Sequence, residues 1–297
     1  MKRRTFLQTS AAFSAAALTA QLARPLYAMP QQSKYMDTIG LQVWTIRDQM
    51  KADSKKALKA VADAGYKQVE LGNVLENPEY ADQARELGLN VTSSFMSWEA
   101  VCKPDKDGAP TTDQVVEAAK KMKLQHLVFG YIGKGFRETS QQMKKIAKST
   151  NELGKKAADA GMQLCYHNHA FEFEKIDGDT TAYDILINEL DNDLVKFEFD
   201  VFWSKIGGWD PLETIKKLDG RVSQVHLKDL KEGTAVIYDE GKVPKDAFQE
   251  CGDGSIDMGA VMKLASEIGA VNCHVEQDQS PDPIKSIGQS IEHLKSL

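Results

Sequence analysis

Eight short apolar runs, each followed by a helical pattern, are the feature of this sequence that most limits its fold. The runs have the length and composition of buried β-strands, and the helical segments between them begin at capping residues and end at glycines. Asp53 or Ser54 opens the first helical segment, and Gly65 closes it. The eight runs are Ile39–Trp44, Gln68–Gly72, Asn90–Phe95, His126–Gly130, Gln163–His167, Lys196–Val201, Ser223–Lys228 and Asn272–Glu276. Eight strand-and-helix units in this order predict a closed (β/α)8 TIM barrel.

An open, doubly wound sheet is the competing architecture for alternating strands and helices. That fold binds dinucleotides through a glycine-rich loop after its first strand, and no such loop follows Ile39–Trp44. A chain of 297 residues is long enough for one barrel as a single domain. We therefore expect one catalytic domain over residues 29–297.

The N-terminus predicts a leader rather than part of the domain. Lys2, Arg3 and Arg4 precede the apolar run 11–20, and Leu26-Tyr27-Ala28 is a small-residue cleavage site. The Arg-Arg-x-Phe-Leu order resembles a twin-arginine signal, which predicts an exported, periplasmic protein with a signal peptide over residues 1–28. A Sec-type signal or a membrane anchor is the alternative. The apolar run is too short to span a bilayer, so we expect no stable membrane insertion after cleavage.

Polar side chains are predicted on the inner face of the barrel. Successive residues of a strand point to opposite faces, so Phe197 and Phe199 face the helices while Glu198 and Asp200 face inward. The same alternation recurs in three other runs, whose inward residues are Gln68, Glu70 and Gly72, then Gln224, His226 and Lys228, then Asn272, His274 and Glu276. Barrel interiors are normally filled by branched apolar residues, so these polar groups need partners.

The most polar inward residues come last in their runs, at the C-terminal rim where TIM-barrel enzymes have their active sites. The predicted rim set is Glu70, His167, His169, Asp200, His226, Lys228 and Glu276. Asp200, His226 and Glu276 supply two carboxylates and an imidazole, a combination suited to Mn²⁺, Zn²⁺, Co²⁺ or Mg²⁺. Such an ion would polarise a sugar carbonyl or enediolate while a carboxylate moves the proton. A metal-free salt-bridge network is the alternative.

Motifs along the chain resemble those of the sugar phosphate isomerase/epimerase group of xylose isomerase-like barrels, which includes inosose dehydratases, inosose isomerases and ketose 3-epimerases. These motifs are GLQVWTIRDQM, YKQVELG, HNHAFEF, FEFDVFW, VHLKDL, GDGSID and HVEQD, and the resemblance spans residues 38–297. It implies a metal held by Glu, Asp, His and Glu at the ends of strands five to eight. Asp200, His226 and Glu276 match the last three, and His167 stands at or near the first.

The histidine in place of the fifth-strand glutamate leaves two alternatives open. Either His167 is the fourth metal ligand, or the metal has three protein ligands and more water. In the epimerases of the group that glutamate also moves a proton, so a symmetrical two-glutamate epimerisation is disfavoured. A one-base isomerisation or a β-elimination, with Glu276 or a histidine such as His169 as base, is the expectation. The function predicted is a metal-dependent isomerase or epimerase that deprotonates a sugar or cyclitol next to a carbonyl, with a dehydratase or lyase as the alternative.

The remaining candidates each have two interpretations. Glu70 is a catalytic or substrate-binding group, or the ion-pair partner of Lys228. Lys228 binds an oxyanion or phosphate of the substrate, or neutralises Asp200 or Glu198. Trp44 and Trp203 are sugar-stacking platforms or core residues. Asn168, between the two histidines, is a predicted substrate contact, and Glu172 is expected to be a loop carboxylate.

Charge and loop length complete the sequence-based expectations. With 37 basic and 43 acidic residues the chain has a net charge of −6, which provides no electrostatic footprint for nucleic acid. A nuclease related to abasic-site endonucleases is therefore a minor alternative, as is a sugar-binding barrel without turnover. The long segment 229–254 is expected to be a lid or a pairing arm. Barrels of this group pair through rim loops, so a homodimer is an open expectation.

Overall fold

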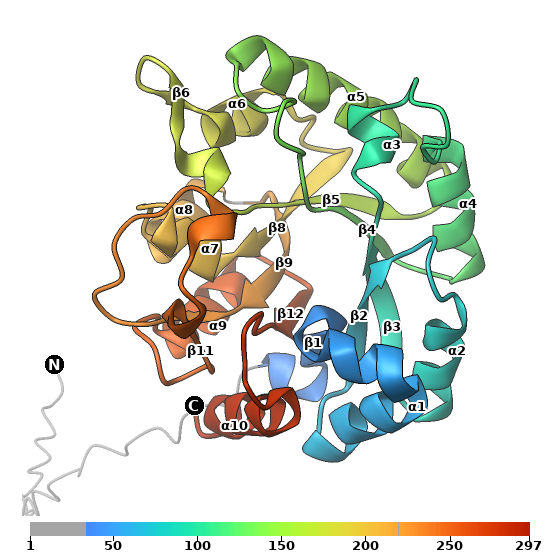
Figure 1. Ribbon diagram of the computed structural model, residues 1–297, viewed down its shortest axis with the longest axis vertical. Helices are drawn as coiled ribbons and strands as arrows, with labels where there is room; N and C mark the ends of the chain where they lie inside the picture. The colour runs from blue at the N-terminus through green and yellow to red at the C-terminus, as the bar shows by residue number, and fades with distance from the viewer. Residues whose placement is uncertain (1–33, 219) are drawn as a thin grey trace, which may run out of the picture. The chain divides into compact units, whose positions relative to one another are not determined.

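Eight parallel strands close into a barrel in the computed structural model, which describes residues 34–218 and 220–297 (Figure 1). Around the barrel the strand order is β1-β12-β9-β8-β5-β4-β3-β2. The strands are β1 (Gly40–Gln42), β2 (Gln68–Asn73), β3 (Asn90–Phe95), β4 (His126–Phe129), β5 (Gln163–His167), β8 (Val195–Asp200), β9 (Val222–Leu227) and β12 (Asn272–Val275). Each of the eight predicted runs overlaps one of these strands, so the predicted TIM barrel is confirmed. The predicted leader over residues 1–28 lies outside the described residues.

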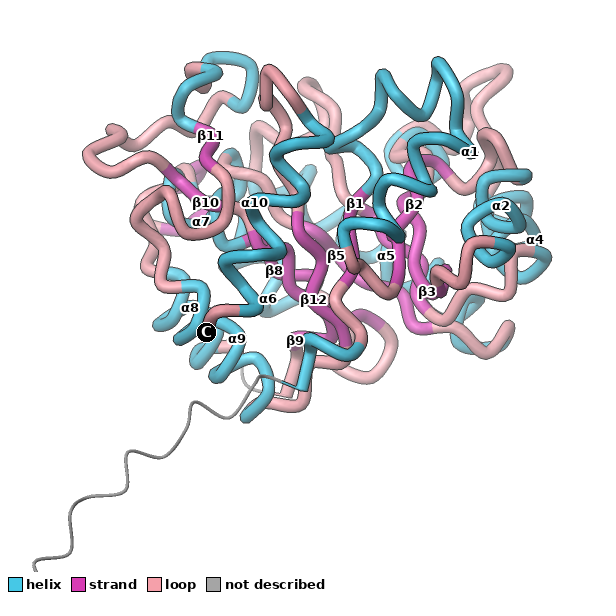
Figure 2. Tube along the Cα trace, turned by 90° about the horizontal axis from the view of Figure 1, so that it is seen from below, coloured by secondary structure: helices cyan, strands magenta, loops and turns pink. Residues whose placement is uncertain are grey.

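Helices surround the strands on the outside of the barrel (Figure 2). They are α1 (Arg47–Ala64), α2 (Glu79–Glu86), α3 (Glu99–Cys102), α4 (Thr112–Lys121), α5 (Ser140–Asp159), α6 (Ala182–Glu189), α7 (Val201–Ile206), α8 (Pro211–Lys217), α9 (Met258–Glu267) and α10 (Pro283–Lys295). Asp210 and Asp282 cap α8 and α10 through their side chains, each with proline in the first turn. No described helix is long and apolar enough to cross a membrane.

The start of the barrel differs from the sequence-based expectation. Strand β1 ends at Gln42, and the 3-10 turn η2 (Val43–Ile46) places Trp44 beyond the strand rather than in it. Helix α1 begins at Arg47 and kinks at Asp53, whose backbone is extended (φ −161°, ψ 92°). Asp53 Oδ1 accepts a hydrogen bond from Lys56 N at 3.0 Å, so the predicted cap exists but restarts the helix instead of beginning it.

The register of the strands sets their inward side chains at matching levels. Asp200 lies opposite His226, and His226 lies opposite His274. The outward Phe197, Val225 and Leu227 are fully buried against the helices, as the alternation predicted. At the lower end of the barrel interior, Asn272 Nδ2 donates to Gln224 Oε1 at 2.7 Å, and Gln68 Nε2 donates to Asn272 Oδ1 at 3.2 Å. Side-chain hydrogen bonds therefore connect the inward amides of β2, β9 and β12 at this level.

Two small antiparallel sheets decorate the barrel: β6 (Lys175–Asp177) with β7 (Thr180–Thr181), and β10 (Asp229–Leu230) with β11 (Phe248–Gln249). The second begins the long segment 229–254. Further along that segment, Glu240 accepts hydrogen bonds from Arg137 Nη2 at 2.8 Å and Tyr131 Oη at 3.1 Å. The segment thus reaches the loop between β4 and α5, which agrees with the expected covering role. A pairing role stays a prediction.

Candidate active site

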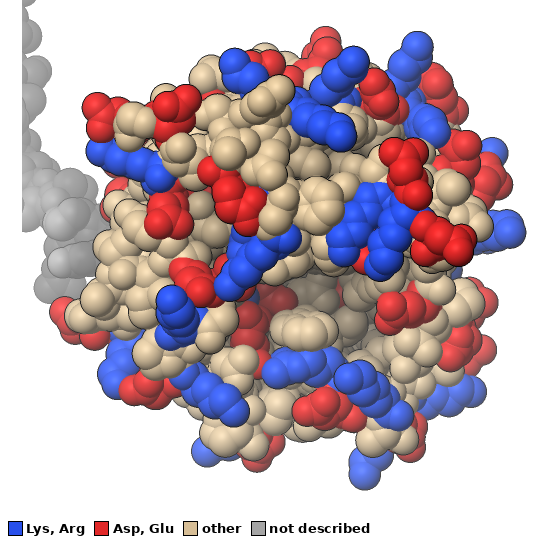
Figure 3. Space-filling model, turned by 45° about the horizontal axis from the view of Figure 1, so that its top comes forward, with Lys and Arg blue, Asp and Glu red and all other residues tan. Residues whose placement is uncertain are grey.

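A cavity of about 440 Å³ opens at the C-terminal ends of the barrel strands. Its walls include six of the predicted site residues: Trp44, His167, His169, Trp203, Lys228 and Glu276. Figure 3 shows a hollow in the surface with basic and acidic side chains interspersed around it. Residues separated by more than two hundred positions in the sequence therefore share one cavity, as the convergence of parallel strand ends predicts.

Four neighbouring side chains form what we call the rim group: His167 and Glu276, which line the cavity, and Asp200 and His226, which are buried beside them. One potential ligand atom from each lies within 4.8 Å of all the others. Asp200 Oδ2 is 3.6 Å from His167 Nε2 and 3.8 Å from His226 Nδ1, and Glu276 Oε2 is 3.3 Å from His226 Nδ1. His167 Nε2 and Asp200 Oδ2 are buried and have no hydrogen-bond partner among the described residues.

The rim group fits a divalent cation. Buried polar atoms are almost always hydrogen bonded, and the unpartnered His167 Nε2 and Asp200 Oδ2 are of the types that ligate transition metals. Two imidazole nitrogens and two carboxylate oxygens match the donor sets of zinc, manganese and cobalt sites. His167, at the position where the family resemblance implied glutamate, is part of the group, which favours its interpretation as the fourth ligand.

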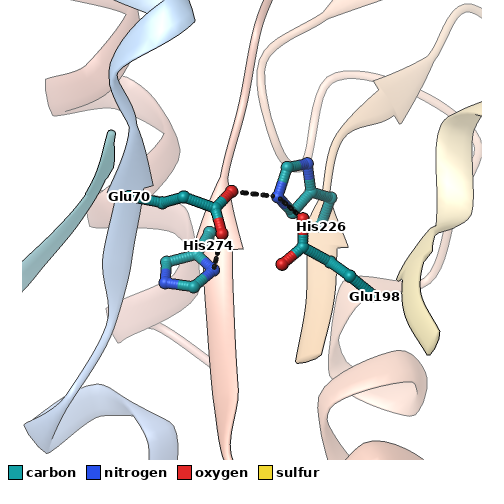
Figure 4. A group of neighbouring side chains, drawn as sticks. All are labelled: Glu70, Glu198, His226 and His274. Carbon is teal, nitrogen blue, oxygen red and sulfur yellow. Dashed lines mark hydrogen bonds and ion pairs between the residues drawn. The ribbon is translucent and has the colours of Figure 1, made fainter. Parts of the chain in front are cut away.

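A second set, the inner group, lies beneath the rim group and consists of Glu70, Glu198, His226 and His274 (Figure 4). His226 Nε2 is 2.8 Å from Glu70 Oε1 and 2.9 Å from Glu198 Oε1. The two ring nitrogens of His226 thus face different groups, Nδ1 the rim and Nε2 the inner carboxylates. Carboxylates that receive the second N–H of a metal-binding histidine fix the orientation of its ring.

Glu70 therefore occupies a different place from the one expected of a catalytic residue. Its carboxylate is fully buried, accepts a hydrogen bond from Gln42 Nε2 at 2.8 Å and does not line the cavity. Its alternative as the partner of Lys228 is not observed either, because His226 is its ionic neighbour. In this structure Glu70 acts on the cavity through His226 rather than by contact with a substrate.

Charge repulsion gives the two carboxyl groups of the inner group different protonation states. Burial and the neighbouring Glu70 carboxylate raise the pKa of Glu198 well above its usual value. Burial also disfavours ionised Glu70, but His274 and His226 hold its pKa well below the usual range. The pKa of His226 is raised despite its burial because Glu198 and Glu70 face it. One protonated and one ionised carboxyl therefore flank the His226 ring.

Lys228 is the cation of the cavity wall. It is 1% exposed, and its Nζ lies 3.0 Å from Glu276 Oε2 and 2.9 Å from Asp278 Oδ1. Burial disfavours the charged amine, but Asp278 and Glu276 raise its pKa, so it remains protonated. Burial raises the pKa of Asp278 to about 6. Sequence reasoning missed Asp278, although its position two residues after Glu276 continues the inward side of the strand.

His169 presents its imidazole to the cavity beside the rim group. Its ring centroid is 5.1 Å from that of His167 and 5.2 Å from that of Trp203, and its Nδ1 has no hydrogen-bond partner among the described residues. Burial, followed by the neighbouring His167 and Lys228, lowers the pKa of His169 well below its usual value. His169 is therefore neutral at physiological pH and is able to accept a proton.

Two neighbours of His169 hold its segment in place. Glu172, in the 3-10 turn η3 (Phe171–Phe173), is fully buried and accepts hydrogen bonds from His169 N at 2.9 Å and Tyr166 Oη at 2.7 Å. This corrects the expectation of a loop carboxylate. Asn168 exchanges two hydrogen bonds with the backbone of Asp200 and does not line the cavity, so its observed role is to join the ends of β5 and β8.

The opposite side of the mouth, formed by β1 to β4, contributes no residue to the rim group and places Phe95, Gly72 and Gly130 in the cavity wall. Phe95 packs its ring 5.2 Å from that of His167 and 6.0 Å from that of His226, covering both from solvent. Gly130 makes room for that ring, since a Cβ there would lie 2.1 Å from Phe95. Gly72 lines the cavity, and a Cβ on it would meet nothing within 4 Å. This side supplies space where the other supplies ligands.

Comparison with known proteins agrees with the barrel. The model of the family described as xylose isomerase-like TIM barrel matches residues 58–297. The chain belongs to this family. Among xylose isomerase-like barrels, an inosose dehydratase from Clostridium botulinum is 28% identical over 251 residues, which are 76% of this chain and 83% of the relative. The family resemblance predicted from the motifs is confirmed.

Solved structures of similar proteins share the fold. A sugar phosphate isomerase/epimerase from Parabacteroides distasonis aligns with a TM-score of 0.72 at 22% identity, over 88% of this chain and 94% of its own. The IOLI protein, solved with a bound zinc atom, aligns with a TM-score of 0.63 at 18% identity, over 87% of this chain and 95% of its own. The chain is thus a member of an enzyme family that includes isomerases and lyases.

Proposed function

We propose that this protein is a divalent-metal-dependent enzyme that removes a proton next to the carbonyl of a keto-sugar or cyclitol. The observation that carries the proposal is the rim group, four side chains of metal-ligating types, two of which line a cavity large enough for a sugar. Two similar proteins support it: the IOLI protein was solved with a bound zinc atom, and the Clostridium botulinum relative is an inosose dehydratase. The small-molecule partner is accordingly a sugar or cyclitol.

His167, Asp200, His226 and Glu276 would hold the ion, and Glu70 with Glu198 would orient His226 from below. A divalent cation in this position polarises a carbonyl oxygen and stabilises the negative charge that develops when the neighbouring carbon is deprotonated. Phe95 excludes water from the imidazoles, which strengthens the electrostatic interactions of the rim group. Lys228 keeps Glu276 ionised and provides a fixed positive charge beside the cavity.

His169 is the base that the geometry favours. Its imidazole lines the cavity, and its Nδ1 makes no hydrogen bond to any residue that the structure describes. Glu276, the other predicted base, is already engaged by Lys228 and His226 and is better suited as a ligand. A single imidazole takes the proton from carbon and then returns it to a new position.

The destination of that proton separates two candidate reactions. Return to the neighbouring carbon gives isomerisation, and return to the opposite face of the same carbon gives epimerisation, whereas delivery to a departing hydroxyl gives water and an unsaturated keto-sugar. The second reaction, a dehydration, needs only one base and is named for the inosose dehydratase relative. The first remains a candidate because Asp278 offers a second carboxyl at the cavity wall.

Proton exchange in heavy water tests the proposal. Purified protein loaded with Mn²⁺, Zn²⁺, Co²⁺ or Mg²⁺ is incubated with a panel of keto-sugars and inososes, and deuterium incorporation and products are followed by NMR. We expect metal-dependent exchange at the carbon next to the carbonyl. His169→Ala is expected to reduce exchange by roughly a hundredfold or more while retaining metal, as loss of general base catalysis predicts.

A residue outside the acid–base set provides the control. Ser204→Ala removes a buried hydroxyl whose hydrogen bond goes to the backbone of Trp209, and it should leave exchange within about twofold. Absence of exchange with every substrate and metal, or unchanged exchange in His169→Ala, contradicts the proposal. An unsaturated product identifies the dehydratase, and an isomeric sugar identifies the isomerase.

We further propose, from the sequence alone, that the protein is exported to the periplasm. The basic residues and apolar run of positions 2–20 carry this proposal. Replacing Arg3 and Arg4 by lysine should retain the protein in the cytoplasm if the signal is of the twin-arginine type.

A further inference from the structure

The cavity extends beyond the space above the rim group. Part of its lining comes from η2 and α1 and from the chain between the end of β2 and the start of α2. We call this part the outer wall; its residues are Trp44, Lys51, Asn73, Glu76 and Tyr80. None of these residues belongs to the rim or inner group. A volume of about 440 Å³ corresponds to about 15 water molecules at ~30 Å³ each, so one sugar ring above the rim group displaces only part of it.

Trp44 is a rigid, exposed platform in the outer wall. Its side chain is 52% exposed although it lines the cavity, and Arg47 packs its guanidinium 4.7 Å from the indole centroid. Arg47 is itself fixed by hydrogen bonds to Trp44 O at 2.9 Å and Asp278 O at 2.8 Å. An exposed indole whose neighbouring guanidinium is fixed in place suits stacking against the C–H face of a sugar ring.

The polar groups of the outer wall fit a hydroxylated ring better than a phosphate. Arg47 is occupied by two backbone carbonyls, and Glu76, which bonds to Asn73 Nδ2 at 3.0 Å, places a carboxylate in the same wall. Lys51, the basic residue of the outer wall, forms no ion pair with any residue that the structure describes. A phosphate needs several donors and no nearby carboxylate, whereas a sugar uses mixed donors and acceptors.

We propose that the outer wall is a second subsite and that the substrate is a glycoside: the oxidised ring lies over the rim group, and the ring attached to it through the glycosidic oxygen stacks on Trp44. This inference rests on the proposed function for the identity of the reacting ring. It adds a binding site that the metal chemistry does not require, with a neutral sugar as its ligand. Gly72 keeps the passage between the two positions open.

Matched variants separate the subsite from the reaction. Trp44→Ala removes the platform, and Gly72→Leu extends a side chain into the cavity, where a Cβ meets nothing within 4 Å. Gly72→Ala controls for the backbone, and Val271→Ala controls for loss of an exposed apolar side chain, since Val271 is 52% exposed at the opposite end of the barrel. Each variant is assayed by proton exchange on paired keto-sugars, free and as glycosides with a second sugar ring.

We expect Trp44→Ala and Gly72→Leu to lower kcat/KM for the glycoside by about tenfold or more, which corresponds to about 1.4 kcal/mol, and for the free sugar by less than threefold. Both controls should stay within twofold of the parent protein. Equal losses for free sugar and glycoside overturn the inference, and so does a preference for a keto-sugar phosphate over both.

A binding measurement decides the inference when no keto-sugar is turned over. Calorimetric titration with unoxidised disaccharides and the matching monosaccharides does not depend on the reaction. Tighter binding of a disaccharide, lost in Trp44→Ala, supports the subsite while the proposed function fails. No disaccharide binding more tightly than its monosaccharide, including no binding of either, overturns the subsite.

Discussion

The two halves of the barrel mouth are built from the same strand geometry but from opposite chemistry. Strands β5, β8, β9 and β12 end in the imidazoles and carboxylates of the rim group, whereas β1 to β4 end near glycines and the ring of Phe95. Side chains converge on both halves because the strands are parallel and tilted in the same sense. All four residues of the rim group thus come from one half, and the small residues of the other half leave space in the cavity.

This division teaches how a polar barrel interior remains stable. The charged half is satisfied from below by the inner group and from the side by Lys228, so few of its charges are left without a partner. Two exceptions are His167 Nε2 and Asp200 Oδ2, both of which lie where a cation would bind. On the side of β1 to β4, Phe95, Gly72 and Gly130 need no such network, and they should tolerate change without affecting metal affinity.

The sharpest test of the comparison removes one anionic ligand. Asp200→Asn keeps an oxygen that can accept the hydrogen bond from Trp203 N, which Asp200 Oδ1 accepts at 2.9 Å as the cap of α7, but it removes the negative charge. We expect affinity for Zn²⁺ or Mn²⁺, measured by competition with a chelator, to fall by more than about a hundredfold, beyond the loss typical of an outer-shell change.

Two controls locate that effect in the charged half. Asp210→Asn changes a similar helix-capping carboxylate away from the cavity, and Phe95→Leu changes the neutral half. Both should leave metal affinity within about threefold. A loss in Phe95→Leu as large as in Asp200→Asn would break the division between the halves.

A smaller effect is expected one layer further in. Glu70→Gln retains a hydrogen-bond acceptor for His226 Nε2 but weakens the charge that orients and polarises the ring. Metal affinity should fall by about 10–100-fold, the range for outer-shell partners of metal ligands. Gln249→Glu, an isosteric change on β11 outside the barrel, is the matched control. Unchanged affinity in Glu70→Gln would mean that the inner group is structural only.

The smallest effect concerns stability behind the charged half. Burial raises the pKa of Glu172 from 4.5 to about 8. Between these values the folded protein holds a proton that the unfolded chain releases. The stabilisation is therefore complete below about pH 4.5 and is lost as the pH rises through about 8, with a slope of up to about 1.4 kcal/mol per pH unit.

Glu172→Gln should flatten this slope in urea unfolding followed from pH 5 to 8. Glu174→Gln, an exposed site two residues further along the chain, is the control and should leave the slope unchanged. The same slope in the parent and in Glu172→Gln would show that this carboxyl is ionised in the folded protein.

Most residues of the charged half could be predicted from the sequence, but few residues of the neutral half could. Along Lys196–Asp200 and the corresponding runs, the apolar residues pack against the helices. Because side chains alternate along a strand, the polar residues between them must point into the barrel. Depth along the axis is not encoded in that pattern. Glu70 and Glu276 both point inward near the ends of their runs, yet one lies below the cavity and the other lines it.

Residues beyond the regular strands were harder to predict. Trp44 was expected in a strand and lies on a 3-10 turn, since the hydrogen bond from Trp44 N to Gln42 Oε1 closes a local turn that periodicity does not reveal. Asp278 lies beyond the end of β12 and was missed, although it continues the inward alternation of Glu276. The contribution of Gly72 and Gly130 to the cavity depends on space left by absent side chains, which becomes visible only in three dimensions.

His226 joins the two groups, because its Nδ1 faces the rim group and its Nε2 faces the carboxylates of the inner group. Metal bound by the rim group would therefore stabilise the inner group through His226 as well as the residues at the mouth. Backbone amides of β9 and β12 should exchange more slowly with solvent in the loaded protein, and heat resistance should report occupancy. The thermal stability of the barrel would then measure how much of the protein carries the metal that the proposed reaction needs.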